Sequence, residues 1–236
     1  MLCYNKVSMN KNFKQQEDLI DFLQRFEVKK EECCLVGSFS LQVLDLKSAG
    51  DIDVSISSST RERIKSEMSI GIDKKIQHKN KYPVHAVVEG GGFLAFLNDV
   101  GISEEELIRN ENLHLIYQGY KVMRPELNYA EKLYRCTKLA HVRPKDFRSI
   151  KLMERHLKTG AHPEYTWDDN LVLFPKNFKD KLRMGVYHPL FKIVFRIRVI
   201  EKNWSYISKF FWCLEYKGLK NTIKMTRDWY GKKNSK

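Results

Sequence analysis

Cysteine, proline and glycine are all scarce in this chain of 236 residues, which has 5 Cys, 6 Pro and 12 Gly. The cysteines do not have the paired spacing of a metal site, and two of them are adjacent and cannot easily pair with each other. We therefore expect no disulfide framework, and a reducing, cytoplasmic location follows from that. The five are Cys3, Cys33, Cys34, Cys136 and Cys213.

Long apolar runs are also missing. No uncharged stretch approaches the ~20 residues that a transmembrane helix needs. The segment from Met1 to Gln16 contains lysines and asparagines but no apolar stretch, so we do not expect a secretory signal. Attachment to the inner face of a membrane remains compatible with this composition.

Acidic residues are few in the last third of the chain. Residues 171–236 contain sixteen Lys or Arg but only four Asp or Glu, a net charge of +12 out of +13 for the whole chain. The first 170 residues are therefore nearly neutral. Such asymmetry predicts a polyanionic partner for residues 171–236, either tRNA or an anionic membrane surface.

Aromatic residues accompany this positive charge. Rings mixed with Lys and Arg can stack on RNA bases, and the same mixture on an amphipathic helix suits a membrane interface. A third interpretation is a helical lid whose rings pack on the preceding core and whose lysines face water. The sequence gives no indication of an oligomeric state. The rings are Trp204, Tyr206, Phe210, Phe211, Trp212, Tyr216 and Trp229.

The residue patterns predict an α+β fold followed by a helical C-terminal region. We divide the chain into a core of residues 1–123, helices that pack on it in residues 124–170, and a basic, aromatic helical region in residues 171–236. Strands are expected over 33–36, 51–57, 69–77, 82–89, 113–117 and 120–123, and helices over 18–26, 39–46, 59–68, from 102, and over 125–157 with an interruption near Pro144.

One stretch carries the strongest chemical information. Gly37-Ser38 follows an apolar strand and precedes Asp51-Ile52-Asp53. Side chains alternate along a strand, so Asp51 and Asp53 share one face while Ile52, Val54 and Ile56 share the other. Two neighbouring carboxylates favour a cation between them, and Mg²⁺ suits such oxygen ligands together with substrate phosphates. A Gly-Ser turn offers backbone N–H groups to a phosphate. The pattern predicts metal-dependent phosphoryl or nucleotidyl transfer.

The same stretch resembles the signature of the DNA polymerase β-like nucleotidyltransferase superfamily, in which an apolar-Gly-Ser turn precedes Asp-apolar-Asp. A second stretch, Glu131-Lys132-Leu133 followed by Arg143-Pro144-Lys145-Asp146, resembles the helices after the core of minimal nucleotidyltransferases, including the AbiEii-type toxins. The chain departs from that pattern at Ser149, where a second Asp is usual. The implied fold is a mixed-sheet, polymerase β-like core.

The resemblance implies a Mg²⁺-dependent enzyme that moves a nucleoside monophosphate from a nucleoside triphosphate to an acceptor hydroxyl. Asp51 and Asp53 would ligate two Mg²⁺ ions, while Gly37 and Ser38 would hold the triphosphate. The acceptor is left open among a small molecule, a surface-glycan precursor, a protein and tRNA. The alternative is a catalytically silent module of the same fold that binds a nucleotide or RNA.

A third carboxylate usually completes such a site from a neighbouring strand. Glu89 is the favoured candidate, because it ends an alternating strand and lies far enough beyond Asp53 for a helix and a return. Asp73 is the alternative, at a tighter spacing. Lys132, Arg143 and Lys145 are expected to contact phosphate, although Lys132 could be a solvated surface base and Lys145-Asp146 a salt bridge at a helix cap.

Overall fold

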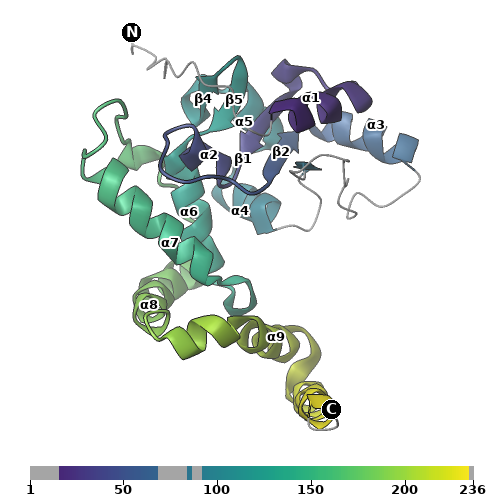
Figure 1. Ribbon diagram of the computed structural model, residues 1–236, viewed down its shortest axis with the longest axis vertical. Coiled ribbons are helices and arrows are strands. Elements are labelled where there is room, and N and C mark those ends of the chain that lie inside the picture. The colour runs from purple at the N-terminus through teal and green to yellow at the C-terminus, as the bar shows by residue number, and fades with distance from the viewer. Residues whose placement is uncertain (1–15, 69–83, 87–91, 234–236) are drawn as a thin grey trace. The chain divides into compact units, whose positions relative to one another are not determined.

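Runs of apolar residues form five strands in the computed structural model, which describes residues 16–68, 84–86 and 92–233 (Figure 1). Four of the expected strands are confirmed with small shifts at their ends. The strand expected over 69–77 lies outside the described residues, and only the middle of the one expected over 82–89 lies within them. The bounds are β1 Cys33–Val36, β2 Ile52–Ile56, β3 Val84–Ala86, β4 His114–Tyr117 and β5 Tyr120–Met123.

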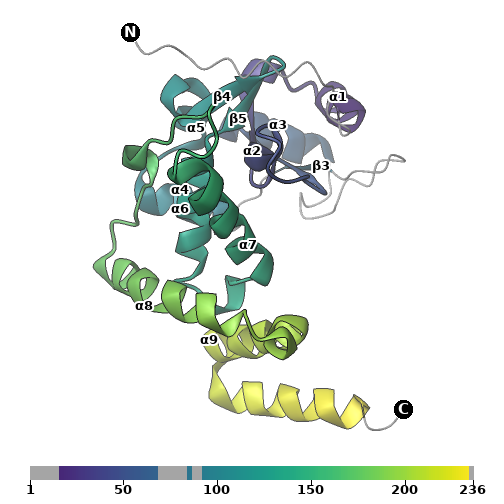
Figure 2. The same ribbon diagram turned by 60° about the vertical axis from the view of Figure 1, so that its left-hand side comes forward.

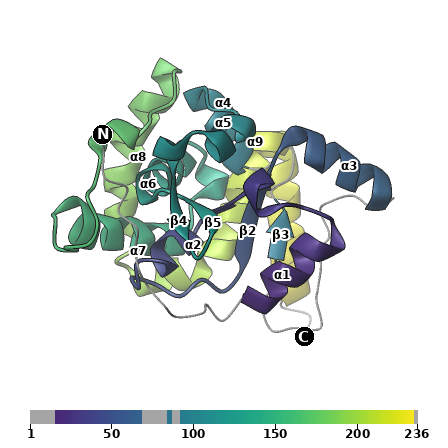
Figure 3. The same cartoon turned by 90° about the horizontal axis from the view of Figure 1, so that it is seen from above.

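These strands form one mixed sheet in the order β3-β2-β1-β5-β4. β1 is antiparallel to β2 and parallel to β5, and β2 is parallel to β3. Figure 3 shows β3 beside β2, with the first helix next to β3. Because β1 and β2 run in opposite directions, the end of β1 lies next to the beginning of β2. This edge of the sheet carries the Gly-Ser turn and the two aspartates.

The β4–β5 hairpin shows how local chemistry fixes the sheet. Its two turn residues, Gln118 and Gly119, have φ angles of +50° and +80°. Positive φ at both positions is typical of the two-residue turns that match the twist of antiparallel strands. The hairpin predicted from Gln118-Gly119 is confirmed, and it places Leu115 opposite Val122.

Helices alternate with the strands. α1 begins near the predicted place, and α5 begins at the predicted cap, where the Ser103 side chain accepts a hydrogen bond from the backbone N–H of Glu106. The predicted long helix is interrupted before Pro144, as expected. The bounds are α1 Gln16–Arg25, α2 Phe39–Gln42, α3 Ser58–Met68, α4 Gly92–Val100, α5 Glu104–Arg109, α6 Pro125–Arg135 and α7 Pro144–Met153, with a π-helical turn over Glu154–Lys158.

The chain forms two compact units that are interleaved in sequence. The first, which we call the sheet unit, comprises Met1–Glu131 and Lys151–Lys176, and the second, the helical unit, comprises Lys132–Ile150 and Asn177–Lys236. The boundaries therefore differ from the sequence division at 123/124 and 170/171, since parts of α6 and α7 belong to each unit.

Two long helices make up most of the helical unit, α8 over Phe178–Val194 and α9 over Arg198–Lys233. The Asn177 side chain caps α8 by accepting a hydrogen bond from the backbone N–H of Lys179. Gly218 has φ +75° and ψ 165°, which interrupts α9, and Figure 2 shows the last segment taking a new direction. Among the described helices, none has the length and apolar character needed to cross a membrane.

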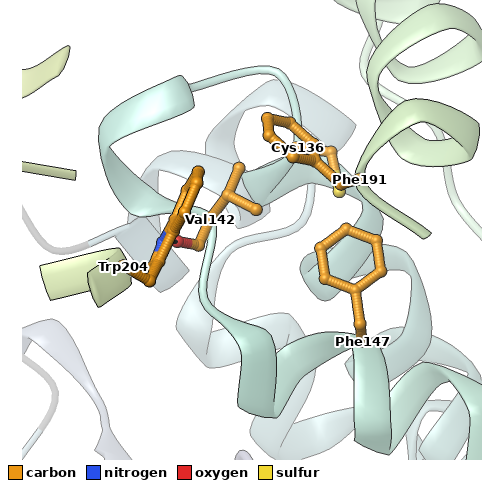
Figure 4. Close-up of a cluster of buried hydrophobic side chains, with 5 residues drawn as sticks. All are labelled: Cys136, Val142, Phe147, Phe191 and Trp204. Carbon is orange, nitrogen blue, oxygen red and sulfur yellow. Dashed lines mark hydrogen bonds between the residues drawn. The ribbon is translucent and has the colours of Figure 1, made fainter. Parts of the chain in front are cut away.

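Aromatic rings form the core of the helical unit (Figure 4). Phe191 on α8 and Phe195, the residue directly after α8, pack against the Trp204 ring on α9, with centroid distances of 5.8 and 4.6 Å. The Phe147 ring lies 5.0 Å from that of Phe195. The indole N–H of Trp204 donates to the backbone oxygen of Val142. Of the predicted aromatic set, Trp204 is therefore buried within the helical unit, and Phe211 is partly buried against the same cluster.

A buried carboxylate lies beside this core. The Asp146 side chain accepts hydrogen bonds from Lys132 at 3.3 Å and from two nitrogens of Arg143 at 2.8 and 3.1 Å. Burial alone would raise the pKa of the Asp146 carboxyl, but the positive charges of Lys132 and Arg143 outweigh that effect and lower this pKa to about 2. The ionised carboxylate is thus part of the folded helical unit.

Replacing Asp146 by Asn should destabilise the helical unit by about 3–5 kcal/mol near neutral pH, because the buried Lys132 ammonium would lose its charged partner. The folded pKa lies below the ordinary value of 3.8, so the carboxylate contributes stability above about pH 4 and loses it as the pH falls towards about 2. The difference in unfolding free energy between wild type and Asp146→Asn should therefore decrease as the pH falls from about 4 to about 2. Urea unfolding followed by tryptophan fluorescence measures it.

Glu201→Gln is the matched control, since it removes a partly exposed ion pair with Arg148 at 3.5 Å in the same unit. Exposed pairs contribute about 0–1 kcal/mol, so this change should have little effect. A gap between wild type and Asp146→Asn that stays constant from neutral to acid pH would contradict the ionised state of Asp146.

Candidate functional site

The Gly37-Ser38 turn follows directly from the end of β1. Gly37 has a φ of +68°, a left-handed conformation that only glycine adopts without cost. Its carbonyl accepts the backbone N–H of Ser40 at 3.3 Å and the Ser40 hydroxyl at 3.0 Å. Ser38 occupies the cap position of α2 but makes no capping hydrogen bond with its side chain. The turn is thus held by Ser40, and the Ser38 hydroxyl takes no part in capping.

The register between β1 and β2 brings the two halves of the motif together. Val36, the last residue of β1, is the partner of Asp53. A Cβ atom added to Gly37 would lie 2.9 Å from the Oδ2 atom of Asp53, closer than such atoms approach in proteins. Gly37 is therefore required by both its backbone angle and its carboxylate neighbour. Sixteen residues separate the two in sequence, and strand pairing closes that gap.

Solvent access distinguishes the motif residues from their neighbours. Ile52, Val54 and Ile56 are fully buried, as the alternation predicts. The motif residues Gly37, Ser38, Asp51 and Asp53 are half-buried, although they interrupt stretches that are otherwise buried. These four residues form what we call the Gly-Asp edge. All four residues of this edge are therefore partly accessible to solvent.

Asn128 supports the turn from α6 and was missed by sequence reasoning. Its Nδ2 atom donates at 2.9 Å both to the Gly37 carbonyl and to the Ser40 hydroxyl. The side chain is fully buried, and its Oδ1 atom makes no hydrogen bond within the described residues. An amide on the apolar face of an amphipathic helix was the only available signal. Asn128 is a positioning residue, because its contacts are with the turn.

The other end of the same β2 face is closed by buried polar groups. Ser55 follows Asp53 on that face, and its hydroxyl donates to the Glu104 carboxylate at 3.0 Å. Glu104 forms an ion pair with Arg61, and the two side chains are 8 % and 6 % exposed. This end of the face is therefore buried and internally hydrogen-bonded, whereas Asp53 at the other end is half-buried.

A loop after α7 is held to the sheet unit by a buried acid. Glu126 on α6 is fully buried and accepts the backbone N–H of Asp168 at 2.8 Å and a hydrogen bond from the Tyr165 hydroxyl. Arg124 pairs with Glu126 at 2.9 Å. Burial and the nearby Glu126 charge raise the pKa of Tyr165. Within this loop the His162 ring lies 3.3 Å from the Leu44 carbonyl, in the connection between α2 and β2.

The structure gives no position for the predicted third carboxylate. Both Glu89 and Asp73 lie outside the described residues. The strand next to β2 is β3, and its residue His85 is the register partner of Asp53. β3 ends at Ala86, and the residues from there to Glu89 lie outside the described part of the chain. Within the described ranges there is no group of three or more His, Cys, Asp or Glu residues that could hold a metal ion.

The three predicted phosphate contacts belong to the helical unit. Lys132 is only 4 % exposed and is paired with Asp146, so its interpretation as a solvated surface base is wrong. Asp146 pairs with Lys132 and Arg143, while Lys145 is exposed. The positive charges of Lys132 and Arg143 therefore neutralise the buried Asp146 carboxylate. A role for Lys132, Arg143 and Lys145 at a phosphate stays a prediction.

Comparison of the chain with protein-family models, curated proteins and solved structures finds no match. The geometry of the sheet unit is therefore the basis for a functional assignment.

Gly37→Ala should disturb the site beyond the backbone cost of about 1–2 kcal/mol for a left-handed residue. The added methyl group would push the Asp53 carboxylate away, so we expect weaker Mg²⁺ binding in calorimetry and lower stability in urea. Gly160→Ala is the matched control, since Gly160 has a φ of +72° with nothing within 4 Å of an added Cβ. Equal Mg²⁺ binding by the two variants would refute the carboxylate contact.

Proposed function

We propose that the sheet unit is the catalytic core of a metal-dependent nucleotidyltransferase. The observation that carries this proposal is the contact across β1 and β2, where the left-handed Gly37 lies against the Asp53 carboxylate. Asp51 and Ser38 complete a half-buried edge around that contact. A hydroxyl, a tight turn and two carboxylates at one accessible edge are the groups that phosphoryl transfer with Mg²⁺ requires.

The order of elements supports the finer assignment to a polymerase β-like core. The turn leads from β1 through the short α2 to the antiparallel β2, and a third strand, β3, lies parallel to β2. This arrangement provides a strand on the far side of β2 from β1, which is where a third carboxylate would be needed. The α6 helix contributes Asn128 behind the turn.

Asp51 and Asp53 fit Mg²⁺ by their chemistry, because both are half-buried oxygen donors, Asp53 on β2 and Asp51 in the bend directly before it. When bound there, the ions supply a clamp on the attacking and leaving oxygens of an in-line displacement. Asn128 and Ser40 fix the Gly37 carbonyl, which keeps the turn and the Asp53 carboxylate in one geometry. Such preorganisation avoids reorganisation of the site during reaction.

Ser38 would donate its hydroxyl hydrogen to a phosphate oxygen of the nucleoside triphosphate, since that hydroxyl does not cap α2. The acceptor hydroxyl attacks the α-phosphate, pyrophosphate leaves, and the third carboxylate takes the proton of the attacking hydroxyl. Glu89 is the proposed third carboxylate and Asp73 the alternative. The acceptor stays open among a small molecule, a surface-glycan precursor, a protein and tRNA.

Asp51→Asn and Asp53→Asn should each abolish Mg²⁺-dependent turnover while the fold stays intact. Removing a metal ligand should cost more than the ~10–100-fold that changes behind the ligands cause. Transfer of label from each α-labelled nucleoside triphosphate to pooled tRNA, protein and lipid acceptors, with pyrophosphate release, measures activity. Asp45→Asn is the control, because Asp45 is an exposed carboxylate in the same connection with a φ of +54° that Asn tolerates.

Near-wild-type turnover in either aspartate variant would show that the metal assignment is wrong. Nucleotide binding by the wild type without any turnover would instead support the catalytically silent module. Thermal unfolding of all three variants separates loss of chemistry from loss of structure, since the changed carboxylates are not fully buried.

Glu89→Gln should lower turnover more than Asp73→Asn does. A positioned general base contributes about 10²–10⁴-fold, and the isosteric amide cannot accept the proton. The same transfer assay at several pH values distinguishes the two, because loss of the base should also flatten the acid limb of the rate profile. The opposite ranking would assign the role to Asp73.

A further inference from the structure

The α8 helix is apolar on two opposite faces. One face, which includes Met184 and Phe191, is buried in the core of the helical unit. The opposite face consists of large apolar side chains spaced four, four, four and three residues apart, which is the repeat of one side of a helix. We call these side chains the α8 stripe. They are Phe178, Leu182, Val186, Leu190 and Ile193, and their exposed fractions are 78, 59, 48, 51 and 63 % in that order.

An exposed stripe of this kind differs from the usual outer face of a helix, which is polar. Single exposed apolar residues are ordinary, but a contiguous patch marks a site of interaction. The same feature continues on α9, where Val199, Tyr206, Phe210 and Leu214 are spaced seven, four and four residues apart and are exposed by 69, 58, 36 and 38 %. Both helices therefore present an apolar face that the described protein does not cover.

The charges around the α8 stripe are of one sign. At 100° per residue, Lys181 and Lys192 lie beside the border of the stripe formed by Phe178, and Lys179 lies just inside the opposite border, between Val186 and Leu190. All three lysines are exposed. Asp180 is the one acid between Asn177 and Arg198 in the sequence, and it is buried and paired with Lys138 and Arg183. The rim of the stripe thus complements a negative surface.

The chemistry of the side chains in the stripe favours an anionic membrane over a nucleic acid as the partner. Four of its five members are aliphatic, and aliphatic side chains do not provide the flat faces on which nucleic-acid bases stack. They do suit acyl chains, while flanking lysines reach the headgroups. The exposed rings of Tyr206 and Trp212 on α9 are of the type enriched at membrane interfaces.

We propose that the helical unit docks on the surface of an anionic membrane, with the α8 stripe inserted at the headgroup–acyl boundary and its lysines on the anionic headgroups. The stripe provides the apolar contact, and the net charge of residues 171–236 provides the attraction. This inference stands independently of the chemistry proposed for the sheet unit.

The test is binding of the full chain to vesicles of phosphatidylcholine mixed with phosphatidylglycerol, compared with vesicles of phosphatidylcholine alone. We expect binding to the anionic vesicles that weakens as salt is added. The triple variant Leu182→Gln, Leu190→Gln, Ile193→Gln should bind at least about tenfold more weakly, because it removes most of the apolar area of the stripe. Lys181→Gln with Lys192→Gln should weaken binding about fivefold for each charge removed.

The double variant Ile116→Gln with Phe174→Gln is the matched control, since these residues are apolar and exposed by 45 and 51 % in the sheet unit. It should bind vesicles as the wild type does. All the changed side chains are exposed, and circular dichroism verifies that each variant is folded.

Failure of the wild type to bind anionic vesicles, or equal binding by the triple variant, would overturn the proposal. It would also be overturned if the triple variant lost affinity for total tRNA in a gel shift while keeping vesicle binding. Conversion of a wild-type dimer to a monomer by the same variant, without loss of vesicle binding, would assign the stripe to a second copy of the chain.

Discussion

A carboxylate oxygen of Asp53 on β2 occupies the space where a side chain at Gly37, just after the antiparallel β1, would begin. This contact requires glycine at 37, requires the register that pairs Val36 with Asp53, and requires a turn that returns the chain into α2. Asn128 then holds the carbonyl of that turn from a helix that begins after β5. The order of β2, β1 and β5 in the sheet follows from the same geometry, since the three must meet at one edge.

The carboxylate of Asp146 and those of Asp51 and Asp53 differ in burial. Asp146 is buried with two positive partners, so its charge is already balanced by the protein. Asp51 and Asp53 are half-buried beside the Gly37 turn, where solvent reaches them. A balanced charge stabilises a fold, whereas an accessible pair can bind a ligand.

Local chemistry made much of the fold predictable. The buried run Cys33–Val36, the alternation through Ile52–Ile56 and the Gln118-Gly119 turn each indicated their own element. The same alternation predicted that Asp53 points away from the core, which agrees with its half-buried position between the buried Ile52 and Val54. The order of the strands, Asn128 and the pairing of Lys132 with Asp146 depend on contacts between distant residues, and nothing in the local pattern indicates them. The division into units was unpredictable for the same reason, because it follows tertiary packing.

The interleaving of the two units has a practical consequence for anyone who shortens the chain. Cys136, Val142 and Phe147 come before the loop of residues 159–175, yet their packing partners Phe191 and Trp204 come after it. A fragment that stops in that loop would retain one half of an aromatic core without the other half. The exposed rings would favour aggregation, so insolubility of such a fragment would result from the position of the cut and would not show that the sheet unit is unstable.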